Sequence, residues 1–324
     1  MTQPNRRRIA LITGGSGFLG RHCLAPLVAG FDEVHATTTR ATPPVVDGVC
    51  WHRADLLHVT STVDLVSRIR PTHLLHLAWV TEHGHYWNSI ENTRWLEASV
   101  QLVRAFAAWG GQRVVTAGTC AEYDWTNGHC SEASTRCAPL TLYGACKHAL
   151  RLAVESCGAL SAAHTRLFHL FGPHEDNRRL TSSVIRSLRT GRRASCTHGE
   201  QVRDFMYIKD AAAAHVKLLA SDVRGPVNIA GGIPITIKEF VLTIGRLLRR
   251  PDAIDFGTIR TPANDPPVLT AEITRLRHEV CFSSQQALEH SLLETLRWHQ
   301  ATPSPLCPIL PTAPFAAVKQ PASF

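Results

Sequence analysis

A tyrosine and a lysine four residues apart form the pair in this sequence best suited to acid–base chemistry. The chain contains four tyrosines, and only Tyr143 has a lysine, Lys147, at the fourth following position. On a helix these positions share a face, so the ammonium could lower the phenol pKa from about 10 toward working pH. Such a phenol can protonate a carbonyl oxygen or deprotonate a hydroxyl. The alternative is a surface helix pair worth a few tenths of a kcal/mol.

A glycine-rich turn near the start of the chain is the second chemical feature. Four apolar residues, 9–12, run into Gly14, Gly17 and Gly20, which predicts a buried strand, a tight turn and a helix. Glycine lets the backbone approach a pyrophosphate, and the helix N-terminus favours negative charge. We therefore expect a dinucleotide here, whose nicotinamide would exchange hydride while Tyr143 transfers the proton.

The end of the second expected strand, Glu33–Thr38, bears on which dinucleotide binds. Folds that bind NAD usually carry a carboxylate there for the ribose 2′-hydroxyl, whereas a 2′-phosphate requires a cation. Here Thr39 and Arg40 follow the strand, with no carboxylate beside them. This pattern favours NADP (as NADPH). The alternative is that Arg40 is only a solvated loop charge and that the cofactor is NAD.

Strand and helix patterns alternate along the first half of the chain and predict an α/β fold. Expected strands cover 9–12, 33–38, 49–53, 73–79, 113–117 and 163–170, and expected helices cover 59–70, 87–109 and 142–156. Nearly continuous apolar strands are typical of a parallel sheet that is covered on both faces. We therefore expect a Rossmann-type, doubly wound parallel sheet.

The second half of the chain is less regular and predicts a smaller C-terminal substrate-binding part. Its expected helices are 181–189, 208–219 and 237–248, and its expected strands are 227–230 and 253–256. We divide the chain into a dinucleotide-binding domain at 1–173 to which 203–232 returns, a substrate-binding part at 174–300, and a Pro-rich tail at 301–324. The tail has six prolines and no apolar pattern with which to join a core.

Composition excludes several classes of protein. The balance of 34 Lys and Arg against 26 Asp and Glu gives +8, but the basic residues are scattered without interleaved aromatics, so we do not expect nucleic-acid binding. Phosphorylated small molecules account for the surplus equally well. No segment reaches the roughly 18 apolar residues of a membrane span. Residues 9–12 are too short a run for a signal peptide.

Cysteine and histidine spacing indicates a reduced protein without a metal site. The ten cysteines contain no C-x-x-C pair. Because the sequence shows no export signal, we interpret them as reduced thiols of a cytoplasmic protein. The eighteen histidines show no H-E-x-x-H or similar ligand spacing. We therefore expect a cytoplasmic protein that holds no metal.

Ordered motifs over about residues 8–300 resemble the extended short-chain dehydrogenase/reductase family, the NAD(P)-dependent epimerase/dehydratases of nucleotide sugars. The motifs are Thr13-Gly14-x-x-Gly17-x-x-Gly20, Asp55-Leu56, His76-Leu77-Ala78, the segment 118–123 (G-T-C-A-E-Y), Tyr143-x-x-x-Lys147, Phe171-Gly172-Pro173, the segment 203–210 (R-D-F-M-Y-I-K-D), and Asn228-Ile229-x-x-Gly232.

The resemblance implies a role for each matching residue. The catalytic residues would be Thr119, Tyr143 and Lys147, and Lys147 would also bond the nicotinamide ribose. Cofactor contacts would come from Gly14, Ser16, Gly17, Phe18, Leu19, Gly20, Thr38, Arg40, Asp55, Leu56, Leu77, Ala78, Lys147 and Phe168. Substrate contacts would come from Thr119, Cys120, Asn177, Arg203 and Arg260, with Arg203 on the diphosphate unless it pairs with Asp204 instead. The helices 87–109 and 142–156 resemble the pair that forms the four-helix interface of a homodimer.

Departures from the family pattern narrow the expected reaction. Relatives that dehydrate the sugar carry Asp-Glu after the catalytic threonine, where this chain has Cys120 and Ala121, so 4,6-dehydration is not expected. Asp124 also replaces the usual glycine on the substrate-side loop. Ketoreduction, epimerisation and decarboxylative oxidation remain. Our leading expectation is NADPH-dependent reduction of a nucleotide-linked 4-keto-6-deoxy sugar; the alternatives are an NAD-dependent 4-epimerase and a non-catalytic dinucleotide sensor.

Overall fold

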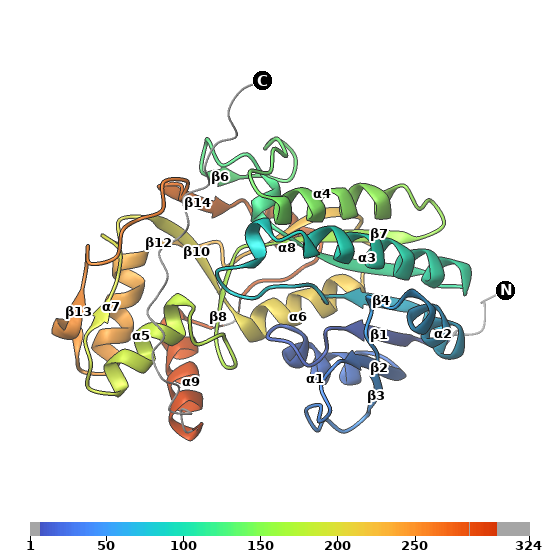
Figure 1. Ribbon diagram of the computed structural model, residues 1–324, viewed down its shortest axis with the longest axis horizontal. Coiled ribbons are helices and arrows are strands. Elements are labelled where there is room, and N and C mark those ends of the chain that lie inside the picture. Colours follow the sequence, from blue (N-terminus) through green and yellow to red (C-terminus); the bar gives the residue numbers. More distant parts are fainter. Residues whose placement is uncertain (1–6, 285, 303–324) are drawn as a thin grey trace.

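A seven-stranded sheet in which every pairing is parallel organises the molecule (Figure 1). The computed structural model describes residues 7–284 and 286–302. The strand order is β11-β7-β5-β4-β1-β2-β3. The strands are β1 (Ile9–Thr13), β2 (Glu33–Thr38), β3 (Val49–Arg53), β4 (His73–His76), β5 (Arg113–Thr119), β7 (Ser161–Leu167) and β11 (Gly225–Ile229). The order reverses between β1 and β4, and ligands of open α/β sheets bind at the carboxyl ends of such a pair.

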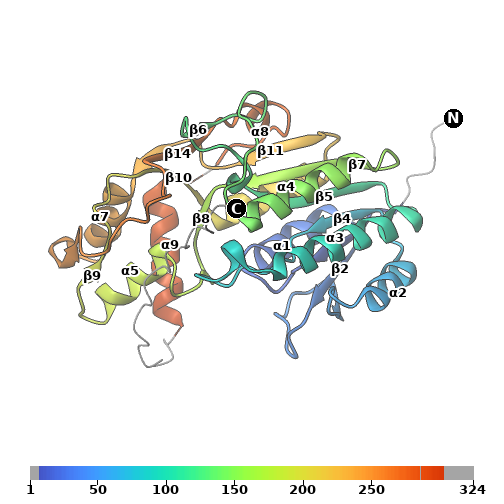
Figure 2. The same cartoon turned by 45° about the horizontal axis from the view of Figure 1, so that its top comes forward.

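Helices cover both faces of this sheet (Figures 1 and 2). α1 (Gly20–Gly30) and α6 (Ile208–Leu219) pack on one face, against the side chains of Ala10 and Ile12. α2 (Val59–Ile69), α3 (Glu91–Ala108) and α4 (Leu142–Glu155) cover the other face, against Leu11 and Leu74. Successive residues of β1 therefore enter opposite cores, which is why the central strands read as continuous apolar runs.

A second, mixed sheet with its own core forms the smaller part. Its strands are β12 (Pro234–Thr236), β10 (Val202–Tyr207), β14 (Val268–Ala271), β6 (His129–Cys130) and β8 (His169–Phe171), which pairs with β10. Around it lie α5 (Leu180–Arg189), α7 (Ile237–Leu247), α8 (Thr274–His278) and α9 (Leu288–Ala301), and the two-stranded sheet of β9 (Ala194–Ser195) and β13 (Ile254–Asp255). Its core gathers buried apolar residues such as Phe171, Ile185, Phe240, Ile244 and Leu292. The predicted fold class, a Rossmann-type sheet with a smaller C-terminal part, is confirmed.

Three expected elements of the first half differ from those observed. The fourth strand ends at His76 instead of Trp79, because the N–H groups of Leu77 and Ala78 donate to Thr13. The expected helix 87–109 divides into a 3-10 turn, η1 (Tyr86–Asn88), and α3. The expected strand 163–170 divides into β7 and β8, since the Phe168 N–H bonds Ile229 of β11 while β8 pairs with β10.

Other segments were not anticipated. Residues 118–139, expected as a polar loop, supply a 3-10 turn, η2 (Cys120–Glu122), and β6. In the segment 203–232, α6 packs on α1 and β11 joins the first sheet, whereas β10 lies in the second. The domain division itself stays a prediction, and the expected tail lies outside the described residues beyond position 302. Among the helices that the structure describes, none is long and apolar enough to cross a membrane.

Candidate active site

The glycine turn between β1 and α1 leaves room only for backbone. Gly14 has a φ of +70°, and its carbonyl accepts a bond of 2.9 Å from the Gly17 N–H. A Cβ at Gly20 would lie 2.1 Å from the Gly14 oxygen, and one at Gly14 would lie 2.9 Å from the Ala78 nitrogen. The turn thus leaves a space that a side chain at these glycines would fill. The space adjoins the N-terminus of α1 and suits a pyrophosphate.

The end of β2 is polar and basic. The Ser16 and Thr38 hydroxyls lie 2.8 Å apart, and the Arg40 N–H donates to the Thr38 hydroxyl at 3.0 Å. Arg21, from the first turn of α1, donates to the Ser16 carbonyl and contacts His174. Burial and then the charge of Arg40 lower the pKa of Arg21, so the two guanidinium groups lie near each other. Within residues 7–284 and 286–302, neither forms an ion pair with a carboxylate.

Several expected cofactor residues line the remaining strand ends. Ala78 lies directly against Gly14, and Phe168, which is buried, follows β7. Leu56 is buried, but the Asp55 carboxylate accepts bonds from the Leu57 N–H and the His58 ring. The Asp55 carboxylate is therefore hydrogen bonded to neighbouring residues of its own loop, and its expected contact with adenine stays a prediction. Phe18, Leu19 and Leu77 are partly buried and pack on neighbouring apolar residues.

Close packing of α4 brings Tyr143 to Thr119. The Thr141 hydroxyl caps α4 by accepting a bond of 3.1 Å from the Gly144 N–H. A Cβ at Gly144 would lie 2.3 Å from the carbonyl oxygen of Ala121 in η2, so glycine allows the helix to touch this turn. The Thr119 side chain hydrogen bonds the Tyr143 phenol as a result.

The environment of Tyr143 corrects one expectation. Burial, with smaller effects of Tyr86 and Cys120, raises the pKa of Tyr143 above its ordinary value, and the hydrogen bond with Thr119 opposes this rise only in part. The Tyr86 ring stands edge-on to Tyr143 at 4.8 Å. The predicted lowering of this pKa by Lys147 is wrong for the site as described, because desolvation outweighs the nearby amine. A protonated phenol is, however, the state required of a proton donor.

Lys147 points into the same buried site. Its Nζ donates a bond of 2.7 Å to the Ala117 carbonyl and lies 5.9 Å from the centre of the Tyr143 ring. Burial lowers the pKa of Lys147 to about 7, although the charge of Glu122 opposes the change. Lys147 can therefore exist as ammonium or amine near neutral pH.

A buried carboxylate that the sequence analysis missed holds Thr119. Glu122 accepts bonds from the Thr119 N–H (2.9 Å), His164 (2.9 Å) and Arg166 (3.1 Å). Burial opposes ionisation of Glu122, but His164, Arg166 and the Thr119 N–H together lower its pKa to about 2. The sequence did point to Glu122, since it lies in the 118–123 motif. Its partner Arg166 is 44 residues away in the chain, so residue spacing could not predict the pair.

The side of the site that we expect to face the substrate is basic. Arg203 is buried and pairs with Asp265 at 2.5 Å, not with Asp204, whose carboxylate accepts bonds from two glycine N–H groups instead. Burial, with Arg203 and Arg179 nearby, lowers the pKa of His169 to about 3. The buried Nε2 of His169 has no hydrogen-bond partner among the described residues.

Of the other expected substrate residues, Cys120 is buried beside Thr119, and burial raises the pKa of its thiol to about 12. Asn177 and Arg260 are exposed, and the structure shows no side-chain hydrogen bond or ion pair for either within its described part. Arg179, absent from our predictions, hydrogen bonds the Tyr86 hydroxyl next to Tyr143. No motif pointed to it, because α5 starts in a segment without a family pattern.

The geometry agrees with comparisons to known proteins. Residues 10–230 match the family described as "NAD dependent epimerase/dehydratase family". The chain belongs to this family. Its predicted resemblance to the extended short-chain dehydrogenase/reductases is thereby confirmed.

Individual members of the epimerase/dehydratase family are distant relatives over most of the chain. UDP-glucose 4-epimerase of Rhizobium meliloti (strain 1021) is 24% identical, over 89% of this chain and 96% of its own length. dTDP-6-deoxy-L-talose 4-dehydrogenase (NAD(+)) of Aggregatibacter actinomycetemcomitans is 25% identical, over 71% and 87%. Among solved structures, MoeE5 in complex with UDP-glucose and NAD has a TM-score of 0.77 and 25% identity, over 90% and 98% of the two chains.

Proposed function

We propose that this protein is an NAD(P)-dependent enzyme that transfers hydride at C4 of a nucleotide-linked sugar, and that the overall reaction is 4-epimerisation. The observation that carries the proposal is the burial of Tyr143, Thr119 and Lys147 together, at the carboxyl edge of the sheet beside the glycine turn. Relatives described as UDP-glucose 4-epimerases cover 89–90% of the chain and support the choice of epimerisation.

Each residue has a distinct part in this chemistry. Thr119 and Tyr143 would hydrogen bond the C4 oxygen. Tyr143 would first lose its own proton to solvent, and its phenolate would then take the proton of the C4 hydroxyl on oxidation and return it on reduction. Lys147 would hold the ribose hydroxyls of the dinucleotide, and the glycine turn its pyrophosphate. When bound, the nicotinamide supplies the hydride acceptor and donor. Arg203 would pair with the sugar diphosphate in place of Asp265.

The residues beside Thr119 support the exclusion of dehydration. Loss of water from the sugar requires a group that protonates the departing hydroxyl and a base that removes a neighbouring proton. Cys120 has a raised pKa and stays a neutral thiol, and Ala121 has no functional group. Glu122 is fully buried and hydrogen bonded to Thr119, His164 and Arg166. It therefore positions Thr119 and would not act on the sugar as an acid or a base.

A second candidate is the NADPH-dependent reduction of a nucleotide-linked 4-keto-6-deoxy sugar to the 4-hydroxy sugar. The observation that favours it is the cation pair Arg21 and Arg40 beside the Ser16 and Thr38 hydroxyls. These groups suit a 2′-phosphate, and no carboxylate of the described residues pairs with them to receive a ribose 2′-hydroxyl. A reductase consumes its dinucleotide at each turnover, whereas an epimerase regenerates it.

One experiment separates the candidates. The purified protein is incubated with UDP-glucose and UDP-galactose with and without NAD⁺, and separately with 4-keto-6-deoxy nucleotide sugars and NADPH, and products are identified by mass spectrometry and NMR. Interconversion of the hexoses without net change in NAD⁺ supports the epimerase. Stoichiometric oxidation of NADPH with formation of the 4-hydroxy sugar supports the reductase. Dinucleotide binding without either reaction would contradict both and would favour the non-catalytic sensor.

A further inference from the structure

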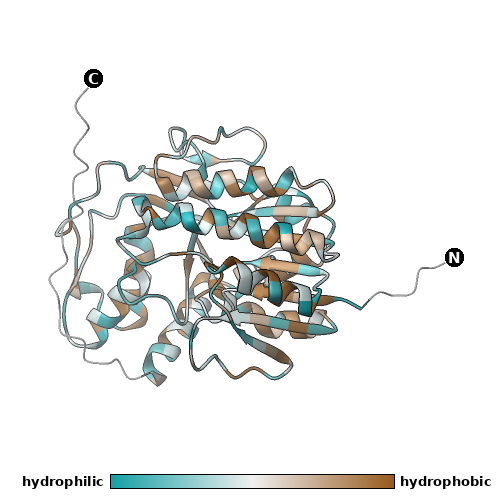
Figure 3. Ribbon diagram, turned by 45° about the vertical axis from the view of Figure 1, so that its right-hand side comes forward, coloured by the Kyte–Doolittle hydropathy of each residue, from teal (hydrophilic) through white to brown (hydrophobic). Residues whose placement is uncertain are grey.

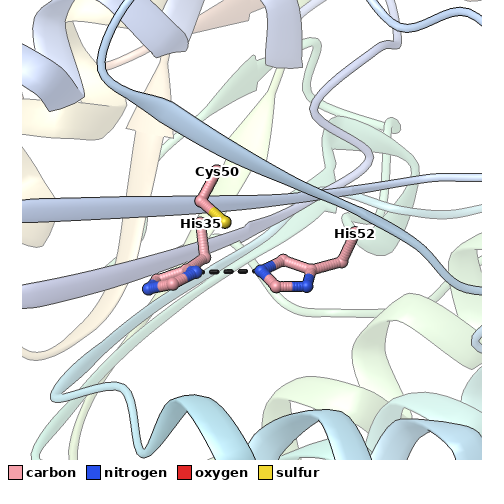
Figure 4. A group of neighbouring side chains, drawn as sticks. All are labelled: His35, Cys50 and His52. Carbon is pink, nitrogen blue, oxygen red and sulfur yellow. Dashed lines mark hydrogen bonds between the residues drawn. The ribbon is translucent and has the colours of Figure 1, made fainter.

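Three ligand-type side chains meet at the β3 edge of the first sheet. Figure 4 shows His35 of β2 facing His52 of β3, with Cys50 beside them. The parallel register pairs His35 with Cys50 and Thr37 with His52, so all three side chains lie on one face. One ligand atom of each residue, a ring nitrogen or the sulfur, lies within 4.8 Å of the other two.

Hydrogen bonds already fix the orientation of the His35 ring toward His52. The Nδ1 of His35 lies 2.9 Å from the Nε2 of His52, and its other nitrogen lies 2.8 Å from a Glu33 oxygen. The Glu33 carboxylate is itself paired with Arg7 at 3.2 Å. A metal-bound histidine usually donates its second N–H to a carboxylate in this manner. Glu33 therefore leaves the Nδ1 lone pair of His35 directed at His52, and a cation can replace the proton that the two rings share.

We propose that His35, Cys50 and His52 form a binding site for Zn²⁺. Atoms within 4.8 Å of one another share a point about 2.8 Å from each, so small side-chain rotations reach the Zn–N distance of about 2.0 Å and the Zn–S distance of about 2.3 Å. Thiolate and imidazole ligands select zinc over magnesium or calcium. Cys50 is exposed, and His52 lines an open cavity of about 680 Å³ beside α2, so solvent can reach the fourth position.

The site was not foreseen because its ligands come from two strands. The segment between His35 and Cys50 is 14 residues long, and only the β2–β3 register brings the two side chains together. The site lies apart from the proposed catalytic residues, which belong to β5 and α4. Zinc would link the edge strand β3 to its neighbour β2, and binding to the folded state alone would raise the thermal unfolding temperature.

Cobalt substitution tests this proposal without an activity assay. The full chain is treated with EDTA under a reductant that does not bind metals, and then titrated with Co²⁺ and with Zn²⁺ as competitor. We expect one equivalent of Co²⁺ per chain, a thiolate-to-cobalt absorption band, and loss of this band on addition of Zn²⁺. Glu33→Gln should weaken Zn²⁺ binding by about 10–100-fold.

Matched variants identify the ligands. Cys50→Ser should abolish the thiolate band, and His52→Gln should weaken Zn²⁺ binding at least as strongly as the change at Glu33. Cys281→Ser, which alters another exposed cysteine, should change nothing. Absence of a thiolate band in the unsubstituted protein would overturn the proposal, and so would a band that persists in Cys50→Ser. The first of these results does not depend on whether a variant folds.

Discussion

The amine nitrogen of Lys147 lies 3.8 Å from the centre of the Trp79 ring. A ring face and the carbonyl oxygen of Ala117 both favour the ammonium form, yet burial lowers the pKa of Lys147 to about 7. The protein thus provides two partners for a charge that burial makes costly. A bound dinucleotide would add ribose hydroxyls and phosphate charge, which favour the ammonium.

Replacement of Lys147 should therefore affect cofactor binding and its pH dependence. We expect Lys147→Met to weaken dinucleotide binding by about tenfold or more, the effect of one lost charge-assisted hydrogen bond. In the unsubstituted protein, affinity should fall as the pH rises above about 7, because the amine loses its proton. Calorimetric titrations from pH 6 to 9 measure both effects. Lys238→Met, at an exposed position, is the control, and equal pH profiles for Lys147→Met and the parent would contradict the assignment.

Replacement of Tyr143 tests the proposed proton transfer. Tyr143→Phe removes one hydroxyl and keeps the ring against Tyr86, so folding and dinucleotide binding should be nearly unchanged. Turnover should fall by roughly 10²–10⁴, the usual contribution of a positioned acid–base group. Tyr207→Phe is the control, because its hydroxyl bonds Glu294 of α9. A rate near that of the parent for Tyr143→Phe on its best substrate would exclude Tyr143 as the acid.

Local sequence signals were sufficient to predict most elements of the first sheet and its helices, and the helix that carries Tyr143 and Lys147. The glycine turn, the strand at Glu33–Thr38 and the helix that carries Tyr143 and Lys147 follow from short-range patterns, and the structure has them. Groups paired through long-range contacts were not predictable. Arg166 meets Glu122, and Arg179 meets Tyr86, only because the sheet and the smaller part bring distant segments together.

The same limit explains the pKa of Tyr143. Helix spacing placed Lys147 near the phenol correctly, but spacing says nothing about how much water the fold removes. Desolvation is a property of the finished packing among α4, η1 and η2, and it reverses the sign of the shift. The short strands of the second sheet, two to six residues each, also lack room for a recognisable alternation.

Arg21 of α1 and Arg40, which follows β2, bear on the expected choice of cofactor. If Arg21 and Arg40 hold a 2′-phosphate, Arg40→Ala should weaken NADPH binding by about tenfold or more and leave NADH binding unchanged. Arg192→Ala, which alters an exposed arginine of the smaller part, should change neither affinity. Fluorescence titrations with both dinucleotides supply the measurement. Should the parent bind NADH as tightly as NADPH, and Arg40→Ala affect neither, the cofactor is NAD and the epimerase is favoured.

Helices α3 and α4 are the surface at which we predict that two copies of the chain form a homodimer. They pack side by side on the sheet, and hydrophobic and hydrophilic turns alternate along them in Figure 3. Leu152 of α4 is 51% exposed, as expected of a residue that a second copy covers. We predict a dimer by light scattering at micromolar concentration and a monomer for Leu152→Glu. Leu293→Glu, at an exposed leucine of α9, should stay dimeric; a monomeric parent protein would contradict the prediction.

A buried carboxyl group in the smaller part should make stability depend on pH. Glu175 accepts two bonds from Ser182, at 3.0 Å and 2.9 Å, and burial raises its pKa to about 7 from 4.5. Between these values the folded state holds a proton that the unfolded state has lost. The free energy of unfolding therefore falls as the pH rises from about 4.5 through 7, by up to about 3 kcal/mol.

Glu175→Gln should remove this contribution, because the amide keeps an acceptor for Ser182 and cannot ionise. Urea unfolding at pH 5 and pH 8 measures the effect. We expect the variant to be about as stable as the parent at pH 5 and more stable at pH 8. Glu289→Gln, on the exposed face of α9, should follow the parent at both values. Asp204, whose pKa burial raises to about 6, adds a slope of the same sign to all three proteins. The comparison between variants therefore isolates Glu175, and a parallel fall in stability for Glu175→Gln and the parent would show that the carboxyl group is ionised in the folded protein at pH 5.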